Sequence, residues 1–371
     1  MTKNILIIEP FFSGSHASWA KQYKKYSSHN IKILSMKGQF WKWRMYGGAV
    51  TLAEEFMSLD FDPDIILATD MIDLTTFISL IRKKIKPSVS IAVYFHENQL
   101  TYPWKANSKD KELQRDINFG FMNYTTALAS DHVFFNSHYN MNSFYIALEN
   151  LLKKMPDYKH TGIIDYLYKK SEVLPIGINL KIIDEGDKKV YTEDLPLILW
   201  NHRWEFDKNP EDFFNALFIL KKEGLRFKVA ILGESYKNSP AIFNEAFKIL
   251  DAEIIKSGCL SGHNYLSWLL ASDILPVTSN HDFFGISVME AVYSGSYPIL
   301  PKRLTYPDLY NLDENPEIFY ENFNELVDKL RYAIINISVI RKKSYKKLAS
   351  PYDWTNLINR YDETIGSLKA N

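Results

Sequence analysis

The chain has 371 residues, more than one ordinary hydrophobic core accommodates, which predicts two domains. Its 46% hydrophobic and 24% charged residues are typical of a globular protein and exclude a disordered chain. The 44 basic side chains balance the 44 acidic ones, so no net charge attracts nucleic acid or lipid. Any site for a polyanion must therefore be a local patch.

A single cysteine, Cys259, excludes an intrachain disulfide framework and favours a reducing compartment. The N-terminal MTKNILIIEP enters a predicted strand almost at once, and its apolar run is too short for a signal peptide. No stretch approaches the ~18 apolar residues that span a bilayer. We therefore expect a cytoplasmic protein without a membrane partner.

Short apolar, β-branched runs recur at the spacing of alternating strands and helices. The predicted strands of the first half are Asn4–Ile8, Ile31–Leu34, Ile65–Ala68, Val89–Phe95, His132–Phe135 and Glu172–Leu174. Helical patterns lie between them, for example at Leu74–Lys84 and Ile117–Ser130.

A polar stretch from Ile176 to Asp194 interrupts this series and predicts a linker. The predicted strands of the second half are Leu197–Trp200, Lys228–Leu232, Glu253–Ile255, Asp273–Val277, Tyr297–Leu300 and Glu317–Phe319. This pattern predicts an α/β protein with two doubly wound domains, residues 1–175 and 176–345. We expect the tail, 346–371, to form a helix that packs back on the first domain.

The stretch from Thr278 to Leu300 predicts a loop, a helix, a turn and a strand. Apolar residues recur at helical spacing over Ile286–Ser294, and Gly295 stands where a C-cap favours positive φ. Asp282 precedes this helix and Glu290 lies inside it. Each feature alone has an ordinary structural explanation, but together they predict an anion site at the free N–H groups of the first helical turn.

Two cations lie five residues apart in the loop after the first strand of the second half. Arg203 and Lys208 suit a diphosphate, Arg as a planar fork and Lys as a point charge. The alternative is a pair of surface ion pairs with Glu205 and Asp207. Gly233 closes the next strand and the segment 257–260 the one after it, and the backbone of either loop is able to frame a base.

Polar residues also follow the strands of the first half. Ser13, Gly14 and Ser15 suit a close approach of phosphate or sugar to the backbone, although such a sequence is more often a plain turn. The Phe40–Arg44 run alternates aromatic and basic residues in a predicted loop. It predicts either core packing or a platform on which nucleobases stack, and both interpretations stay open.

The fourth strand ends in His96, Glu97 and Asn98, and His96 is a candidate to hold a substrate hydroxyl. The sequence has no CxxC, no HExxH and no His/Asp cluster with the spacing of metal ligands. It therefore predicts no metal site.

Three long stretches carry a resemblance to a known family. They are YFHENQLTYPW (94–104), WNHRWEFDKNPEDFF (200–214) and HDFFGISVMEAVYSGSYPILPKRLTYPDLY (281–310). The Arg203, Lys208 and Asp282-to-Glu290 pattern resembles the donor site of retaining GT-B glycosyltransferases related to family four. The long stretches, with IIEPFFSGSH (7–16) and WKWR (41–44), are similar to tRNA-queuosine mannosyltransferases, and the resemblance covers nearly the whole chain. It implies a GT-B fold, two Rossmann-like domains facing a central cleft.

The resemblance also implies roles for single residues. Arg203 and Lys208 would neutralise the departing diphosphate, and Glu290 would bind the ribose. The donor site would further include His281, Asp282, Phe284, Gly285 and Gly233, with His96 near the reacting sugar. The acceptor side would include Ser13, Gly14, Ser15, His16, Trp41, Trp43, Arg44, Glu97 and Asn98. The family usually carries Glu where this chain has Asp282, one methylene shorter.

The implied reaction transfers mannose from GDP-mannose to a cyclopentene-diol hydroxyl of queuosine in the anticodon of aspartate tRNA, with retention and without metal or cofactor. A tRNA partner needs basic surface, for which Lys21, Lys24, Lys25 and the runs 83–86 and 341–347 are candidates, although such runs are usually solvated helix faces. One alternative keeps the fold and uses a lipid or glycan acceptor; another is a catalytically silent RNA-binding module. A catalytically silent RNA-binding module would not need residues that bind a diphosphate, so Arg203, Lys208 and Glu290 argue against the second alternative.

Overall fold

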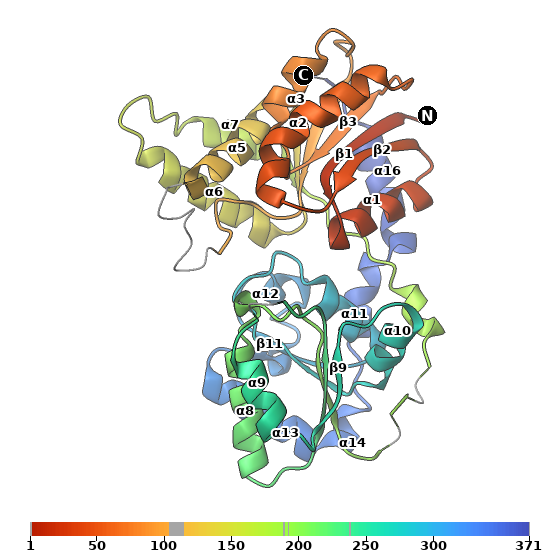
Figure 1. Cartoon of the computed structure of the whole chain (residues 1–371), viewed down its shortest axis with the longest axis vertical. Helices are drawn as coiled ribbons and strands as arrows, with labels where there is room; N and C mark the ends of the chain where they lie inside the picture. The colour runs from red at the N-terminus through yellow and green to blue at the C-terminus, as the bar shows by residue number, and fades with distance from the viewer. Residues whose placement is uncertain (1, 104–114, 188–189, 192, 237–238, 371) are drawn as a thin grey trace. The chain divides into compact units, whose positions relative to one another are not determined.

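The computed structural model describes residues 2–103, 115–187, 190–191, 193–236 and 239–370, so Trp104 of the 94–104 stretch lies outside the described residues. The chain divides into two compact units. Unit 1 comprises Met1–Ile178 and Trp354–Asn371, and unit 2 comprises Asn179–Asp353. Within the described residues each unit contains a six-stranded sheet flanked by helices (Figure 1).

The sheet of unit 1 has the strand order β2-β1-β3-β4-β5-β6, and its paired strands are all parallel. The strands are β1 Asn4–Phe12, β2 Asn30–Lys37, β3 Ile65–Thr69, β4 Ser90–Phe95, β5 His132–Phe135 and β6 Ser171–Val173. Because helices cover both faces, central strands such as β3 are buried at every position and therefore read as continuous apolar runs.

The helices of unit 1 are α1 Gly14–Tyr26, α2 Trp41–Ser58, α3 Leu74–Ile81, α5 Arg115–Ala129, α6 His138–Lys153, α7 Ile163–Lys169 and α16 Trp354–Gly366. Helices α2 and α3 pack on one face of the sheet through a core that includes Phe56 and Phe77, and α5 and α6 extend the helical layer over β4 and β5. Helices α1 and α16 lie together on the other face (Figure 1).

The C-terminal helix α16 belongs to unit 1. Trp19 of α1 donates a hydrogen bond of 3.0 Å from Nε1 to the hydroxyl of Tyr361, and Tyr361 donates one of 2.8 Å to the carbonyl of Pro175. Trp354 is fully buried and stacks on Tyr23, with ring centroids 5.9 Å apart. The burial of these large aromatic rings accounts for the packing of α16 against α1.

The sheet of unit 2 is also parallel, with the order β12-β11-β10-β7-β8-β9. Its strands are β7 Leu197–Trp200, β8 Lys228–Leu232, β9 Ile254–Gly258, β10 Ile274–Pro276, β11 Tyr297–Pro301 and β12 Phe319–Tyr320. Its α-helices are α8 Pro210–Lys222, α9 Ile242–Ile249, α10 Gly262–Ala271, α11 Ile286–Ser294, α12 Tyr306–Leu309, α13 Phe323–Ile335, α14 Ile337–Ile340 and α15 Lys346–Ala349. Helix α8 packs beside α9 and α13, and α10 packs beside α11.

The structure confirms the α/β architecture and corrects two local expectations. The Phe40–Arg44 run is not a loop, because α2 begins at Trp41. The last predicted strand starts later than Glu317, since Pro316–Ile318 forms a 3-10 turn that leaves only Phe319–Tyr320 in the sheet. Among the described helices, none has the length and apolar character required to cross a bilayer.

Candidate functional site

In unit 2, Lys208 ends a short 3-10 helix, Phe206–Lys208, just before α8. Its side chain is only 10% exposed, and Nζ lies 3.3 Å from Asp282 Oδ2 and 3.4 Å from Asp207 Oδ2. The same nitrogen donates a hydrogen bond of 2.8 Å to the carbonyl of His281. Two carboxylates and a carbonyl therefore hold the ammonium group in place.

Asp282 is held in its charged form. Tyr306 of α12 donates a hydrogen bond of 2.8 Å to Asp282 Oδ2. Burial opposes the charge, but the neighbouring Lys208 ammonium, with a smaller contribution from His202, outweighs it, so the pKa of Asp282 lies below its ordinary value. Asp282 is therefore an ionised anchor for Lys208.

The loop that carries Asp282 is tied to the loop that carries Lys208. Thr278 Oγ1 donates a hydrogen bond of 2.9 Å to the carbonyl of Lys208. Arg303 donates from Nη2 to the carbonyl of Thr278 at 2.8 Å and from Nε to that of Ser279 at 3.1 Å. These contacts fix the two loops that follow β7 and β10, at the carboxyl ends of parallel strands, where α/β sheets bind ligands.

Arg203 lies in the same loop as Lys208, but its side chain is half exposed. Its Nη1 is 3.1 Å from Glu205 Oε2. The ion-pair alternative is therefore seen for both cations, although Lys208 is buried and not at the surface. Binding of a diphosphate by Arg203 and Lys208 stays a prediction.

Gly233 directly follows β8, and its backbone lies close to the loop after β7. A Cβ at this position would lie 2.2 Å from the carbonyl oxygen of His202, and its φ is +112°. Both facts require glycine here. The adjacent Trp204 donates from its backbone N–H to the carbonyl of Glu234 at 2.9 Å, so the two strand-end loops are joined.

Helix α11 begins after Gly285, which has a φ of +79° and offers no side chain to cap the helix. Phe284 is buried and its ring packs against Tyr352. His202 Nδ1 lies 3.2 Å from Ser287 Oγ in the first turn. Burial, followed by the charge of Lys208, lowers the pKa of both His202 and His281 to about 4, so both imidazoles are neutral near pH 7.

Glu290, one turn further into α11, faces a different environment. Tyr265 of α10 donates a hydrogen bond of 2.8 Å to Glu290 Oε2. Burial raises the pKa of Glu290 to about 7, although the Tyr265 hydrogen bond acts in the opposite direction. A carboxyl group that titrates near neutral pH is typical of functional sites.

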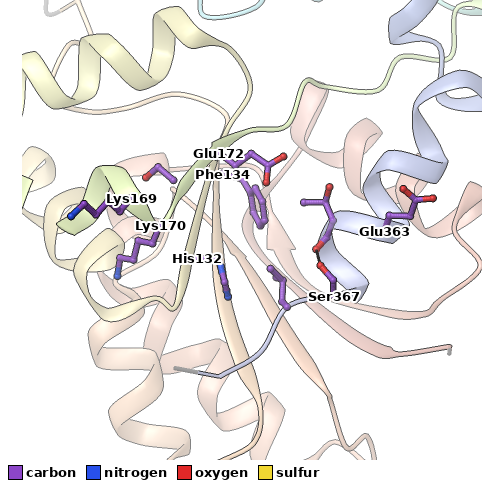
Figure 2. Close-up of a pocket in the computed structure, with 10 residues that line it drawn as sticks. His132, Phe134, Lys169, Lys170, Glu172, Glu363 and Ser367 are labelled. Carbon is purple, nitrogen blue, oxygen red and sulfur yellow. Dashed lines mark hydrogen bonds between the residues drawn. The ribbon is translucent and has the colours of Figure 1, made fainter. Parts of the chain in front are cut away.

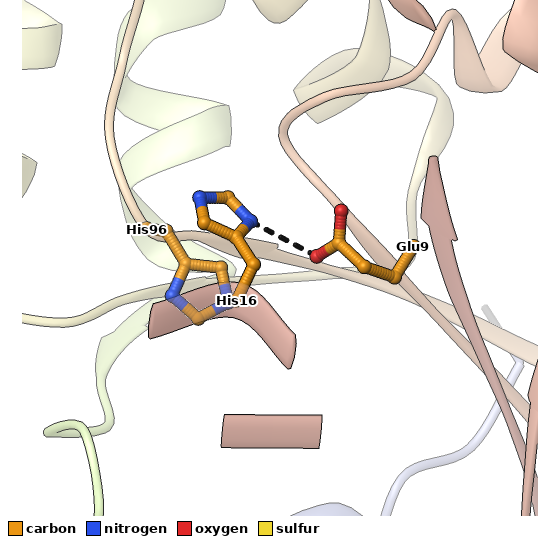
Figure 3. A group of neighbouring side chains, drawn as sticks. All are labelled: Glu9, His16 and His96. Carbon is orange, nitrogen blue, oxygen red and sulfur yellow. Dashed lines mark hydrogen bonds and ion pairs between the residues drawn. The ribbon is translucent and has the colours of Figure 1, made fainter. Parts of the chain in front are cut away.

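In unit 1, three buried side chains meet at the carboxyl edge of the sheet (Figure 3). His16 Nδ1 of α1 lies 3.0 Å from Glu9 Oε2 of β1, and the rings of His16 and His96 have centroids 4.2 Å apart. Burial alone would lower the pKa of His16, but Glu9, with Asp70 and Glu97 beyond it, raises it to about 9. His96 shows the opposite shift: burial and the charge of His16 hold its pKa well below the ordinary value.

The donor atoms of Glu9, His16 and His96 lie within 4.8 Å of one another, which a metal ion held by two histidines and a carboxylate is able to bridge. However, a metal would have to displace the proton that Glu9 stabilises on His16. We therefore interpret the cluster as an ion pair beside a neutral His96, and the absence of a metal requirement stays a prediction. Neither ring nitrogen of His96 has a hydrogen-bond partner among the described residues.

Asn98 is fully buried, and its side chain is engaged within the protein. Its Nδ2 donates to Asn140 Oδ1 at 2.8 Å, and its Oδ1 accepts from Thr101 N–H at 3.0 Å. Asn140 donates in turn to the carbonyl of Phe95 and to Asn136 Oδ1. In this structure Asn98 supports the loop after β4. Glu97 is partly buried and accepts a hydrogen bond from its neighbour in that loop, Gln99 Nε2.

The remaining acceptor-side candidates lie at the starts of α1 and α2. Ser13 precedes α1 with its side chain partly buried, and the exposed Gly14 and Ser15 form the first turn. Trp41 packs against Tyr102 and Phe119, with ring centroids 5.9 and 5.3 Å away. In contrast, Trp43 is 63% exposed.

One cavity of about 490 Å³ lies elsewhere in unit 1 (Figure 2). Its lining includes His132 and Ser171, the first residues of β5 and β6, together with Glu363 and Ser367 near the end of α16. It therefore opens at the amino ends of the strands, away from the edge that holds His96. No residue predicted as a site from the sequence lines it.

Several residues that shape the site were missed in the sequence. They are Glu9, Thr278, Arg303, Tyr306, Tyr265 and His202. All of them except Tyr265 lie inside stretches recognised in the sequence, but no local pattern gave them a role. Tyr265 lies outside those stretches, and nothing in the sequence connects it with Glu290.

The fold is that of GT-B glycosyltransferases. Sucrose-phosphate synthase from Thermosynechococcus elongatus superimposes with a TM-score of 0.72 at 12% identity, over 98% of both chains. A structure described as trehalose-6-phosphate from E. coli bound with UDP-2-fluoro glucose gives a TM-score of 0.68 at 13% identity, over 98% of this chain and 99% of that one.

Sequence comparison is more specific. A family model described as tRNA-queuosine alpha-mannosyltransferase N-terminal matches residues 4–178. The tRNA-queuosine alpha-mannosyltransferase of Drosophila melanogaster is 35% identical over 338 residues, which cover 88% of this chain and 86% of the fly protein. The chain belongs to the tRNA-queuosine alpha-mannosyltransferase family.

Proposed function

We propose that this protein is a retaining glycosyltransferase that moves mannose from GDP-mannose to a cyclopentene-diol hydroxyl of queuosine in the anticodon of aspartate tRNA. Membership in the family and the GT-B fold support glycosyl transfer. The observation that carries the donor half of the proposal is the fixed position of Lys208 between Asp282, Asp207 and the carbonyl of His281.

Unit 2 supplies the donor site. The Lys208 ammonium, the exposed Arg203 guanidinium and the uncapped N–H groups at the start of α11 form a set of donors for a diphosphate. Charge develops on the diphosphate as it leaves, and cations already in place stabilise that charge without reorganisation. This arrangement replaces a metal ion in the proposed mechanism.

Other residues of unit 2 recognise the rest of the donor. Glu290, held by Tyr265, is assigned to the ribose hydroxyls. Asp282 and the neutral His281 are assigned to the sugar hydroxyls, and the backbone beside Gly233 to the base. The charge of Asp282 also orients Lys208. Although Asp is one methylene shorter than Glu, its Oδ2 reaches to 3.3 Å from Lys208 Nζ.

Unit 1 supplies the acceptor side. The neutral His96 offers one ring N–H and one acceptor nitrogen, so it is suited to hold a substrate hydroxyl. In the reaction the bond between the anomeric carbon and the diphosphate oxygen breaks, and a bond to the queuosine oxygen forms on the same face. The hydroxyl proton passes to the leaving diphosphate.

A transfer assay tests this proposal. Queuosine-containing and queuosine-free tRNA are each incubated with GDP-mannose or UDP-galactose, and the nucleosides are identified by mass spectrometry. We expect a hexose only from GDP-mannose and only on queuosine tRNA. Transfer from UDP-galactose would overturn the donor assignment, and donor hydrolysis without transfer would overturn the tRNA acceptor.

The same assay with Lys208→Ala tests whether Lys208 binds the diphosphate of the donor. The loss of one preorganised cation at the leaving group is expected to reduce transfer about 100-fold or more. Lys222→Ala, at an exposed position in the last turn of α8, is the matched control and is expected to retain full activity. A Lys208→Ala variant with unchanged transfer would contradict the assigned role.

A further inference from the structure

Three aromatic side chains near the start of α2 are exposed to solvent. Phe40 is 76%, Trp43 63% and Tyr46 42% exposed, and we call them the aromatic surface. Large aromatic rings normally bury most of their area, so three exposed rings within seven residues indicate a binding surface.

Two of these exposed rings have unusual local geometry. Phe40 has a φ of +54°, a left-handed conformation that bulky side chains rarely adopt, and it lies immediately before α2. Trp43 lies against Gly47 one turn further on: a Cβ on Gly47 would be 2.6 Å from the indole ring. The indole of Trp43 therefore packs against the helix at Gly47, while most of the side chain stays exposed.

The chain segment that carries these rings is positively charged although the whole chain is neutral. Residues 10–53 contain six lysines and one arginine and no Asp or Glu. Three of these cations gather close to the aromatic surface: Arg44 Nε donates to the carbonyl of Lys37 at 3.1 Å, and Lys42 Nζ lies 5.5 Å from the Trp41 ring. Nearby, Lys21 Nζ lies 5.2 Å from the ring of Phe12, whose register partner in the sheet is Lys37.

This region adjoins the loop assigned to the acceptor. A Cβ on Gly38 would lie 2.2 Å from Ser13 Oγ, so the segment that leads into α2 touches the residue that leads into α1. His16, which packs against His96, lies in the first turn of that same α1. The aromatic surface is thus connected to the candidate acceptor site within unit 1.

We propose that the aromatic surface stacks unpaired bases of the acceptor RNA while Lys37, Lys42 and Arg44 contact its phosphates. The inference deepens the proposed function, because it assigns the tRNA contact to one surface. Exposed rings interleaved with cations are the combination by which proteins bind single-stranded nucleic acid. A duplex hides its base faces, so the preferred partner is an unpaired loop.

Binding of the full chain to a labelled anticodon stem-loop, measured by fluorescence anisotropy, tests the inference. Trp43→Ala and Phe40→Ala are each expected to weaken binding about 5- to 100-fold, because each removes one stacking face. Trp43→Phe retains a ring and is expected to restore much of the affinity. Lys37→Ala is expected to lower the slope of log affinity against log salt by about 0.7.

Tyr332→Ala is the matched control, since Tyr332 is a 50% exposed aromatic residue of unit 2. It is expected to bind the stem-loop as the native chain does, and the melting temperature of every variant is measured to exclude unfolding. Native affinity of Trp43→Ala for the stem-loop would overturn the inference. The inference would also be overturned if Trp43→Ala lost as much affinity for a perfectly paired duplex as for the stem-loop. The same holds if Trp43→Ala lost affinity for anionic vesicles while its RNA binding was unchanged.

The outcome is separable from that of the proposed function. If mannose transfer fails while stem-loop binding depends on Trp43, the RNA surface is upheld and the reaction is wrong. If transfer to queuosine tRNA succeeds while Trp43→Ala binds RNA normally, the reaction is upheld and the surface is wrong.

Discussion

The carboxylate of Glu9 lies 3.0 Å from Nδ1 of His16, both side chains are buried, and the His16 ring lies beside that of His96. A second oxygen of Glu9 accepts the Phe11 N–H at 2.8 Å, so the carboxylate is held on both sides. The pair fixes a positive charge against one face of His96. Burial, with this charge as a second cause, lowers the pKa of His96, so the ring is neutral and able both to donate a hydrogen bond to a hydroxyl and to accept one from it.

The first prediction concerns stability against pH. His16 has a pKa of about 9, above its ordinary 6.5, so it binds a proton more tightly when folded than when unfolded. Its contribution to stability is therefore fully present below pH 6.5 and is lost as the pH rises through 9. We expect up to about 3 kcal/mol of the free energy of unfolding to disappear over this range.

Urea denaturation at pH 6.5, 8 and 9.5 measures this loss, and Glu9→Gln is the comparison. Without the carboxylate the pKa of His16 falls, and the slope over this pH range is expected to flatten. If Glu9→Gln shows the same slope as the native chain, His16 is not the group responsible.

The second prediction separates steric contact from backbone strain. Gly233 and Gly224 both have positive φ. A Cβ added at Gly233 would clash with the His202 carbonyl, whereas a Cβ added at Gly224 would have no neighbouring atom within 4 Å. We expect Gly224→Ala to cost about 1 kcal/mol of unfolding free energy and Gly233→Ala clearly more. Gly233→Ala is further expected to raise the KM for the donor, since it displaces the loop that carries Arg203. Equal effects of the two substitutions would contradict the contact.

Much of the fold could be predicted from the sequence because fully buried parallel strands read as short apolar runs. β7, β8 and α11 have the predicted bounds, and Gly295 has the expected left-handed conformation. The start of α2 was predicted wrongly because Phe40 precedes it. Neither the Ser, Thr, Asp or Asn that usually marks a helix start nor an acidic first turn is present. The two tryptophans therefore looked like part of a loop.

The candidate site could be predicted only in part. Lys208, Asp282 and Glu290 stood out because a loop or helix carries them at recognisable spacing. Their partners did not, because Tyr306, Tyr265 and Arg303 reach the site through tertiary packing. Nothing in the sequence singled out Glu9, and only the structure brings His16 and His96 close to it.

The third prediction concerns the buried amides under the loop after β4. Asn140 accepts from Asn98 and donates to Asn136 Oδ1 and to the carbonyl of Phe95. Asn140→Ala removes these three hydrogen bonds between buried groups and is expected to lower the free energy of unfolding by about 2–3 kcal/mol. Asn142→Ala, at an exposed position of the same helix, is expected to change it by less than about 0.5 kcal/mol. Chemical denaturation measures the free energy of unfolding of both variants. Similar losses in the two would show that the Asn140 hydrogen bonds do not stabilise the loop after β4.

The fourth prediction uses the ionisation of Glu290. Its pKa of about 7 means that the carboxylate, the form that accepts hydrogen bonds from ribose hydroxyls, is fully present only above neutral pH. We expect the KM for the donor to fall as the pH rises from 6 to 8, and Glu290→Gln to abolish this dependence. Tyr265→Phe removes the hydrogen bond that favours the ionised form. It is expected to move the midpoint upward by about 0.5–1 pH unit, because a hydrogen bond of about 1 kcal/mol corresponds to somewhat less than one pKa unit. Steady-state kinetics from pH 5.5 to 9 measure this shift, and an unchanged or lower midpoint in Tyr265→Phe would show that another group controls donor binding.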